Sequence, residues 1–227
     1  DYHFYIKKRY DKSYLLKIIC IDYSFTISTA WSPFSDVLIS NLAPGAFERI
    51  VSNAELEQFP KLIRCHISGY GPDGPYANRK AYDLLIQGEV GVIASTGTEE
   101  QKARPGVSIA DLAGGIYALA SINAALVERG RTGLGQRIDV SLFDALAEWM
   151  SPLLLAQKYS GITPPPAGRG HASITPYGPY PTKDGKEIQI AVQNNGQWQR
   201  LCRDVLKRED LANDESLVNN SGRLSKR

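Results

Sequence analysis

Residues 37–67, VLISNLAPGAFERIVSNAELEQFPKLIRCHI, alternate between the patterns of strands and helices. Residues 37–39 form a short apolar run that ends in a turn, and residues 46–50 predict a helix. A second helix is predicted from Asn53 to Phe59, with Asn53 as its cap, and residues 62–67 are typical of a buried strand. Strand, helix and strand in that order predict a parallel βαβ layer.

The chain continues to alternate on the C-terminal side of this layer. Residues 82–94 and 108–129 have the apolar spacing of helices, and the second stretch has the strongest such pattern in the chain. Residues 137–140 predict a strand, and the Ser141 to Asp144 spacing is that of a capping box. Three consecutive prolines, Pro164 to Pro166, indicate a stiff break. Beyond them, residues 183–186 predict a hairpin turn before a strand at 187–192.

Composition excludes several classes of function. With 26 Lys and Arg against 24 Asp and Glu, the net charge of +2 predicts no nucleic-acid partner. Lysine, aspartate and polar residues interrupt the apolar stretches, so we expect no membrane span. The three histidines have no ligand-like spacing, so no metal is expected. Three widely separated cysteines, Cys20, Cys65 and Cys202, predict neither a disulfide framework nor a zinc site. They favour an intracellular setting, cytoplasmic or in the mitochondrial matrix.

The candidate catalytic residue is Asp111, in the first turn of the 108–129 helix. The N–H groups and the dipole of a helix start favour an ionised carboxylate, which is the form that a nucleophile requires. Gly114 and Gly115 are costly inside a helix unless another group must approach closely. The alternative is structural, because Ser108 and Asp111 also have capping-box spacing. By spacing alone the cap is favoured, since most helices have caps.

Four segments change that balance when they are taken together. They are DVLISNLAPGAFER at 36–49, SGYGPDGP at 68–75 with AYD at 81–83, RPGVSIADLAG at 104–114, and RTGLGQRIDV at 131–140. As a set they resemble the class III CoA-transferase family, which includes formyl-CoA transferase, carnitine CoA-transferase and α-methylacyl-CoA racemase. In that family the nucleophile is an aspartate at the position of Asp111.

The resemblance implies a reaction that needs neither a metal nor a nucleotide cofactor. Asp111 would attack an acyl-CoA such as succinyl-CoA, and CoA would then pass through an aspartyl-CoA thioester to an acceptor carboxylic acid. The resemblance also implies a homodimer. It implies a Rossmann-like, parallel-sheet CoA-binding domain over residues 36–163 and the start of a smaller α+β domain over 164–227. Residues 1–35 match no family segment, including the strand with which family members begin, so we expect a piece of a longer enzyme.

The resemblance also assigns binding residues position by position. Those expected to bind CoA are Asn41, Leu42, Ala46, Arg49 and Lys80, and Tyr82 matches an active-site tyrosine. Gly168 and Gly170 match a glycine loop that closes over the aspartyl intermediate. Arg169 and His171 in the same loop could bind the distal carboxylate of a dicarboxylate. Each has a structural alternative: a surface arginine, a solvated lysine, a core tyrosine or a plain connecting loop.

Two rival functions remain. The racemase branch of the family has a histidine where Tyr82 stands and an acidic residue near Asn195, and this sequence has neither. Without a second base, racemisation loses one of its two proton-transfer groups, so a transferase is favoured. The other rival is a catalytically silent CoA-binding fragment.

Overall fold

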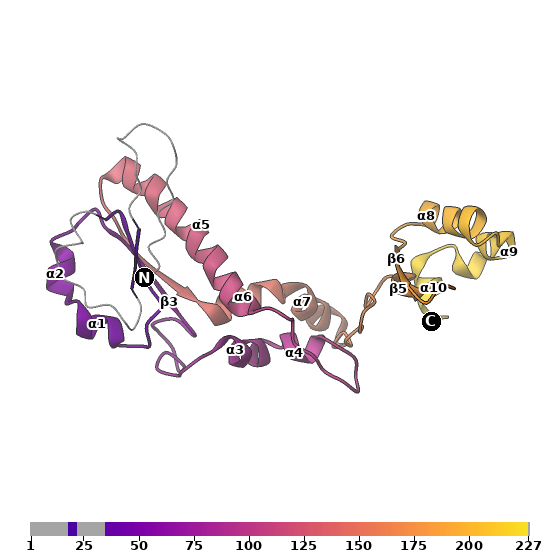
Figure 1. Ribbon diagram of the computed structural model, residues 1–227, viewed down its shortest axis with the longest axis horizontal. Helices are drawn as coiled ribbons and strands as arrows, with labels where there is room; N and C mark the ends of the chain where they lie inside the picture. Colours follow the sequence, from indigo (N-terminus) through magenta and orange to yellow (C-terminus); the bar gives the residue numbers. More distant parts are fainter. Residues whose placement is uncertain (1–17, 22–34, 227) are drawn as a thin grey trace. The chain divides into compact units, whose positions relative to one another are not determined.

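The computed structural model describes residues 18–21 and 35–226 (Figure 1). The chain divides into two compact units. The first is formed by Asp1–Gly91 and Pro105–Pro152, and the second by Val92–Arg104 and Leu153–Arg227. The boundaries predicted at residues 36 and 164 stay predictions.

The first unit contains a four-stranded sheet in the order β1-β2-β3-β4. Its strands are β1 (Ile18–Ile21), β2 (Val37–Ser40), β3 (Ile63–Ser68) and β4 (Arg137–Ser141), and every neighbouring pair is parallel. The predicted strands and the parallel βαβ layer are therefore confirmed. Strand β1, which pairs with β2, was not recognised in the sequence. The remainder of residues 1–34 lies outside the described part of the chain.

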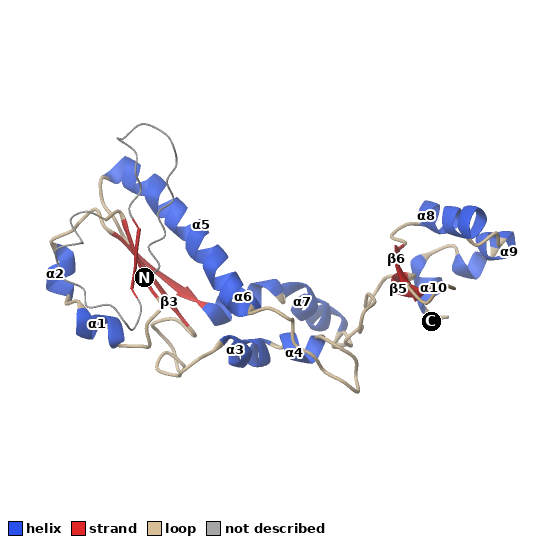
Figure 2. Cartoon of the chain, in the orientation of Figure 1, coloured by secondary structure: helices blue, strands red, loops and turns tan. Residues whose placement is uncertain are grey.

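Helices cover both faces of this sheet, as Figures 1 and 2 show. The short helices α1 (Ala46–Ile50) and α2 (Asn53–Glu57) lie on one face, where Phe47 and Leu56 pack with Leu38 of β2. The long helix α5 (Ile109–Thr132) lies on the other face. The first unit is thus an α/β layer structure, as predicted.

Helix α5 packs on the sheet with a side that is rich in alanine. Ala118, Ile122 and Ala125 pack against residues of β2, β3 and β4. The large apolar residues that mark the helix in the sequence, Leu112, Ile116 and Leu119, are instead 54–62% exposed. By length and composition alone α5 could cross a membrane, but its small-residue side is part of the core of this α/β layer.

Helix boundaries differ from the predictions in two places. The 82–94 helix is two helices, α3 (Asp83–Val90) and α4 (Val92–Ser95), because Gly91 adopts a left-handed φ of 92°. The cap of α2 is Ser52 rather than Asn53: Ser52 and Glu55 form a capping box. After β4 come α6 (Leu142–Trp149) and α7 (Ser151–Ser160), and the Ser141 cap of α6 is confirmed by a 3.1 Å hydrogen bond from Asp144 N–H.

The second unit is built on an antiparallel hairpin of β5 (Tyr177–Pro181) and β6 (Glu187–Ala191), which confirms the turn predicted at 183–186. Short helical segments follow: α8 (Asn195–Arg200), η2 (Leu201–Val205), α9 (Glu209–Asn213), η3 (Glu215–Leu217) and α10 (Asn220–Leu224). Trp198, Cys202 and Ala212 form its buried centre with Val192.

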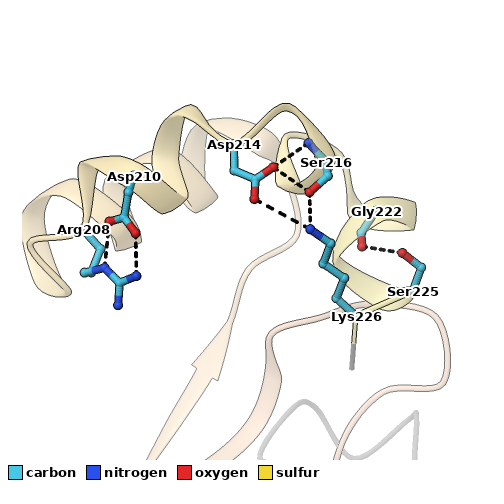
Figure 3. A network of polar contacts seen from close by, with 7 residues as sticks. All are labelled: Arg208, Asp210, Asp214, Ser216, Gly222, Ser225 and Lys226. Carbon is cyan, nitrogen blue, oxygen red and sulfur yellow. Dashed lines mark hydrogen bonds and ion pairs between the residues drawn. The ribbon is translucent and has the colours of Figure 1, made fainter.

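Polar contacts hold the last helical segments of this unit together (Figure 3). The Asp214 carboxylate accepts hydrogen bonds from Ser216, and the Lys226 ammonium contacts both residues. Arg208 and Asp210 form a separate two-point ion pair. These groups are exposed, so each pair contributes little stability on its own.

Candidate active site

Asp111 lies in the first turn of α5, as predicted, but the capping alternative is wrong. The Ser108 side chain makes no cap hydrogen bond. The N–H of Ala110 instead donates to Oδ1 of Asp83 at 2.8 Å, so a carboxylate from α3 caps α5. The Oδ2 atom of Asp83 accepts a 2.5 Å hydrogen bond from the Gln87 side chain.

The ionisation of Asp111 also differs from the expectation. The helix start should favour the charged form and lower the pKa. The pKa of Asp111 is instead raised, first by partial burial of its carboxyl group and second by the negative charge of Asp83. The residue as a whole is exposed, so the carboxylate is open to a reactant. A raised pKa makes a carboxylate a stronger nucleophile once it is ionised.

The two glycines after Asp111 have different roles. A Cβ on Gly114 would collide with Leu142 of α6 and would lie 3.7 Å from Ile67 of β3. Gly114 is therefore required for close packing, and it brings the first turns of α5 to the carboxyl end of β3. Around Gly115 there is open space within 4 Å of a Cβ. Gly115 leaves the exposed side of α5 free of a side chain one turn beyond Asp111.

Tyr82 lies near the start of α5 because the next residue, Asp83, is hydrogen-bonded to it. It is the N-cap residue of α3, directly before Asp83, and its side chain is 74% exposed. The alternative of a core tyrosine is therefore wrong. Lys80 is also exposed. The Asp83–Ala110 hydrogen bond thus joins the segment that carries Lys80 and Tyr82 to the helix start that carries Asp111.

The loop that leads to Lys80 is closed by aromatic and ionic contacts. The Arg79 guanidinium lies 4.3 Å from the centre of the Tyr76 ring and 5.9 Å from that of Tyr70, and it pairs with Glu89 of α3 at 3.3 Å. Tyr70 and Tyr76 meet edge to face. These contacts connect the loop to α3.

A pocket of about 280 Å³ opens at the carboxyl ends of β2 and β3, beside the first half of β4. Leu42 lines it, as do Pro44 and Gly45 of the turn after β2. Arg49 is exposed, and its Nη1 atom lies 3.6 Å from where a Cβ on Gly45 would be, so a guanidinium lies at this edge of the pocket. Of the other residues predicted to bind CoA, Asn41 is exposed and Ala46 is buried, and neither lines the pocket.

Three further side chains line this pocket that were not among the predicted site residues, those of His66, Arg137 and Asp139. Arg137 and Asp139 are paired at 2.9 Å on β4, and Asp139 is the register neighbour of His66. The pKa of His66 is lowered, first by burial and next by the positive charge of Arg137. The alternation of polar residues at 137 and 139 was the available signal, because period two on a strand places them on one face.

The glycine loop lies in the second unit. Gly168 has a left-handed φ of 59°, and its N–H donates to the carbonyl of Gly97 at 2.7 Å. The Arg169 guanidinium forms a two-point ion pair with Glu187 of β6, at 2.8 and 2.5 Å. A substrate carboxylate would therefore compete with Glu187 for Arg169. Nδ1 of His171 accepts a hydrogen bond from the Ser173 N–H at 3.1 Å.

A second pocket, of about 370 Å³, borders this loop. Thr98, Glu99 and Glu100 form one side, and residues 165–168 with Ala172 form the other. Gly170 N–H closes a turn onto the carbonyl of Ala167. Gly168 thus lines the pocket and is also held by its backbone hydrogen bond to Gly97. Within the described residues, no cluster of His, Cys, Asp or Glu has the arrangement of a metal site.

These features define a class: an α/β protein whose candidate site lies at the carboxyl ends of a parallel sheet, where ligands of such folds bind. The chain belongs to CoA-transferase family III, whose profile matches residues 34–227. It is 40% identical over 167 residues to succinate–glutarate CoA-transferase of Agrobacterium fabrum, which covers 73% of this chain and 41% of that protein. It is 34% identical over 195 residues to acetyl-CoA:oxalate CoA-transferase of Acetobacter aceti, a match that covers 84% of this chain and 50% of that protein.

Solved structures agree with this assignment. A CaiB/BaiF family protein from Brucella suis superimposes with a TM-score of 0.74 at 35% identity, over 87% of this chain and 53% of that one. The Rv3272 protein of Mycobacterium tuberculosis shares the fold, with a TM-score of 0.72 at 23% identity over 87% of this chain and 51% of its own. The chain thus spans about half the length of the relatives that it matches.

Proposed function

We propose that this chain is the nucleophile-bearing part of an enzyme that moves CoA from an acyl-CoA, such as succinyl-CoA, to a carboxylic acid. The observation that carries the proposal is Asp111, an exposed carboxylate at a helix start, with a raised pKa, in a chain of CoA-transferase family III. A carboxylate nucleophile allows one thioester to be exchanged for another through covalent steps.

The proposed reaction has two halves. An Asp111 oxygen attacks the thioester carbonyl, which forms a mixed anhydride and releases CoA thiolate. The thiolate then attacks the Asp111 carbonyl, which leaves aspartyl-CoA and frees the first acid. An acceptor carboxylate reverses both steps and leaves as the new acyl-CoA, so Asp111 ends as it began. Tyr82, exposed beside this helix start, is available to contact the reacting acyl group.

The described residues fit part of a bound CoA. The pocket of about 280 Å³ is the size of one portion of this long substrate, and its edge carries the Arg49 guanidinium. A guanidinium matches a phosphate through paired hydrogen bonds. We propose that Arg49 and Lys80 contact CoA phosphates and that Asn41, Leu42 and Ala46 form the wall beside them. Asn41 and Lys80 are exposed and hence free to do so.

For the acids, we propose dicarboxylates. The names of the relatives refer to succinate, glutarate and oxalate, all of which have two carboxyl groups. Arg169 and His171 are the candidates for the distal carboxylate, and Gly168 and Gly170 would close over the intermediate. The Arg169–Glu187 pair is exposed, and an exposed pair is weak enough to be exchanged for a substrate carboxylate.

We also propose a homodimer in an intracellular compartment. The exposed apolar side chains of Leu112, Ile116 and Leu119 on α5 are a surface that a second copy could cover. Cys65 and Cys202 are buried free thiols, and burial raises the pKa of Cys65 to about 11, which favours an unreactive thiol.

The decisive test is the covalent intermediate. The protein is incubated with succinyl-CoA, quenched with acid and digested, and the peptide that contains Asp111 is weighed. We expect a CoA adduct on Asp111 that disappears when glutarate is added as acceptor. A silent fragment gives no adduct with any acyl-CoA. A racemase instead exchanges solvent deuterium at the α-carbon of a 2-methylacyl-CoA without an acceptor acid.

A further inference from the structure

Two side chains of α3, the partly buried Asp83 and the buried Gln87, hold the start of α5. Asp83 Oδ1 accepts the Ala110 N–H at 2.8 Å, and Asp83 Oδ2 accepts Gln87 Nε2 at 2.5 Å. Gln87 is fully buried. Both oxygens of Asp83 are thus engaged, one by the residue directly before Asp111 and the other by a fully buried side chain.

Asp83 acts only as an acceptor in these contacts. Both of its oxygens accept hydrogen bonds, which is what an ionised carboxylate does. The Oε1 atom of Gln87 has no hydrogen-bond partner within the described residues, although it is buried. An unsatisfied buried oxygen is costly. Among the described residues, Gln87 is therefore held through its amide nitrogen alone.

A neutral cap would hold the helix start equally well. Ser, Thr and Asn cap helices through a single oxygen, and Ser108 already stands at the N-cap of α5 without making that bond. What Asp83 adds is a negative charge next to Asp111. The charge also acts on Asp111, since it is one of the two causes that raise the pKa of that carboxyl.

We infer that Asp83, held by Gln87, is a positioning residue that orients the Asp111 turn and whose charge drives Asp111 toward its covalent form. The inference rests on the proposed function. In the free enzyme, the negative charge of Asp83 repels that of Asp111. In aspartyl-CoA the Asp111 group is a neutral thioester, and the negative charge has left with the freed acid. The repulsion is thereby relieved, so Asp83 favours the intermediate.

The experiment measures the fraction of Asp111 present as aspartyl-CoA at equilibrium with succinyl-CoA and succinate. In Asp83→Asn, the side-chain oxygen still accepts the Ala110 N–H. Its new NH₂ group can donate to Gln87 Oε1 after that amide rotates, so shape is kept and charge is lost. We expect the adduct fraction to fall by roughly fivefold, with little change in the KM for succinyl-CoA. Asp83→Glu keeps the charge and should restore the fraction to about half of wild type or more.

The matched control is Glu128→Gln, which removes a carboxylate from the other end of α5, where it forms an exposed pair with Arg131. It should leave the adduct fraction unchanged.

If wild type forms no adduct, the proposed function itself fails. If wild type forms the adduct and Asp83→Asn forms as much of it, the role of the charge is refuted. The same holds if Asp83→Asn and Asp83→Glu lower the adduct fraction equally. If Asp83→Asn does not fold, the Asp83→Glu result decides, since loss of adduct in a folded Glu variant also overturns the inference.

Discussion

Gly168 donates its backbone N–H to the carbonyl oxygen of Gly97 at 2.7 Å. The bond ties the candidate glycine loop to a turn some seventy residues earlier in the chain, where Gly97 pairs with Lys102 in an isolated bridge. The loop is therefore anchored by backbone, and the shape of the Gly97 turn determines where the loop begins.

Replacement of Gly97 should disturb this anchor. Gly97 has a φ of +88°, and a Cβ there would collide with the carbonyl of Gln101. We expect Gly97→Ala to cost about 2–4 kcal/mol of stability, from backbone strain and the collision together, and to lower transferase activity. Urea unfolding and steady-state rates check this. Gly185→Ala is the control, because Gly185 has a φ of +78° in open space and should lose only about 1–2 kcal/mol. Equal losses for the two variants would contradict the anchor.

Ionisation of Asp111 should lower the stability of the folded chain. Because its pKa is raised in the folded state, the stability it contributes is present at low pH and is lost as the pH rises through the raised pKa. We expect Asp111→Asn to gain stability relative to wild type as the pH rises from 3.8, the ordinary pKa, and to keep that gain at neutral pH while losing at least about 10³-fold in kcat. Denaturant unfolding across this range measures the difference. A difference that is independent of pH would show that Asp111 is not perturbed.

His66 should give the opposite pH dependence. Burial and Arg137 lower its pKa below the usual 6.5, so the unfolded chain binds the proton more readily. The stability that neutral His66 provides is therefore lost as the pH falls through 6.5 toward the lowered value. We expect wild type to lose more stability between pH 7.5 and pH 5 than His66→Gln does. Parallel curves for the two proteins would argue against a partly buried, neutral His66.

The Arg169–Glu187 pair offers a test of substrate recognition. Both side chains are exposed, so Glu187→Gln should change stability by less than about 1 kcal/mol. It frees the guanidinium, and we expect a lower KM for glutarate with no change for a monocarboxylic acceptor. Arg169→Met should raise the glutarate KM alone. If both variants affect the two classes of acid equally, Arg169 orders the loop and does not bind substrate.

A charge among the exposed apolar side chains Leu112, Ile116 and Leu119 of α5 should weaken the proposed dimer. Leu119 is 62% exposed, so Leu119→Glu should leave the folded chain intact and shift a dimer toward monomer in sedimentation experiments. Ala118, its neighbour on the buried side, is 4% exposed, and Ala118→Glu should prevent folding because a charge would be buried against the sheet. A Leu119→Glu protein that stays dimeric would place the interface elsewhere.

Local pattern was a good guide to individual elements. The strand at 37–39, the helix at 46–50, the long helix from 108 and the hairpin turn at 183–186 were all predicted, because backbone hydrogen bonds and side-chain periodicity repeat over a few residues. The pattern failed at Gly91, where one left-handed glycine divides a helix, and at β1, whose four residues are too few to show a period.

The sequence alone determined the parallel α/β layer, the position of Asp111 in the first turn of α5 and the resemblance to class III CoA-transferases. Only the tertiary structure revealed that Asp83 caps that helix, that Gln87 holds Asp83, and that Arg169 is already paired with Glu187. Most of these contacts join residues from different elements, and the periodicity within one element does not predict contacts with another. The apolar spacing of α5 identified the helix, but which side faces the sheet depended on how closely the backbone could approach it. Ala118 and Ala125 allow the close approach, whereas Leu112, Ile116 and Leu119 are left exposed.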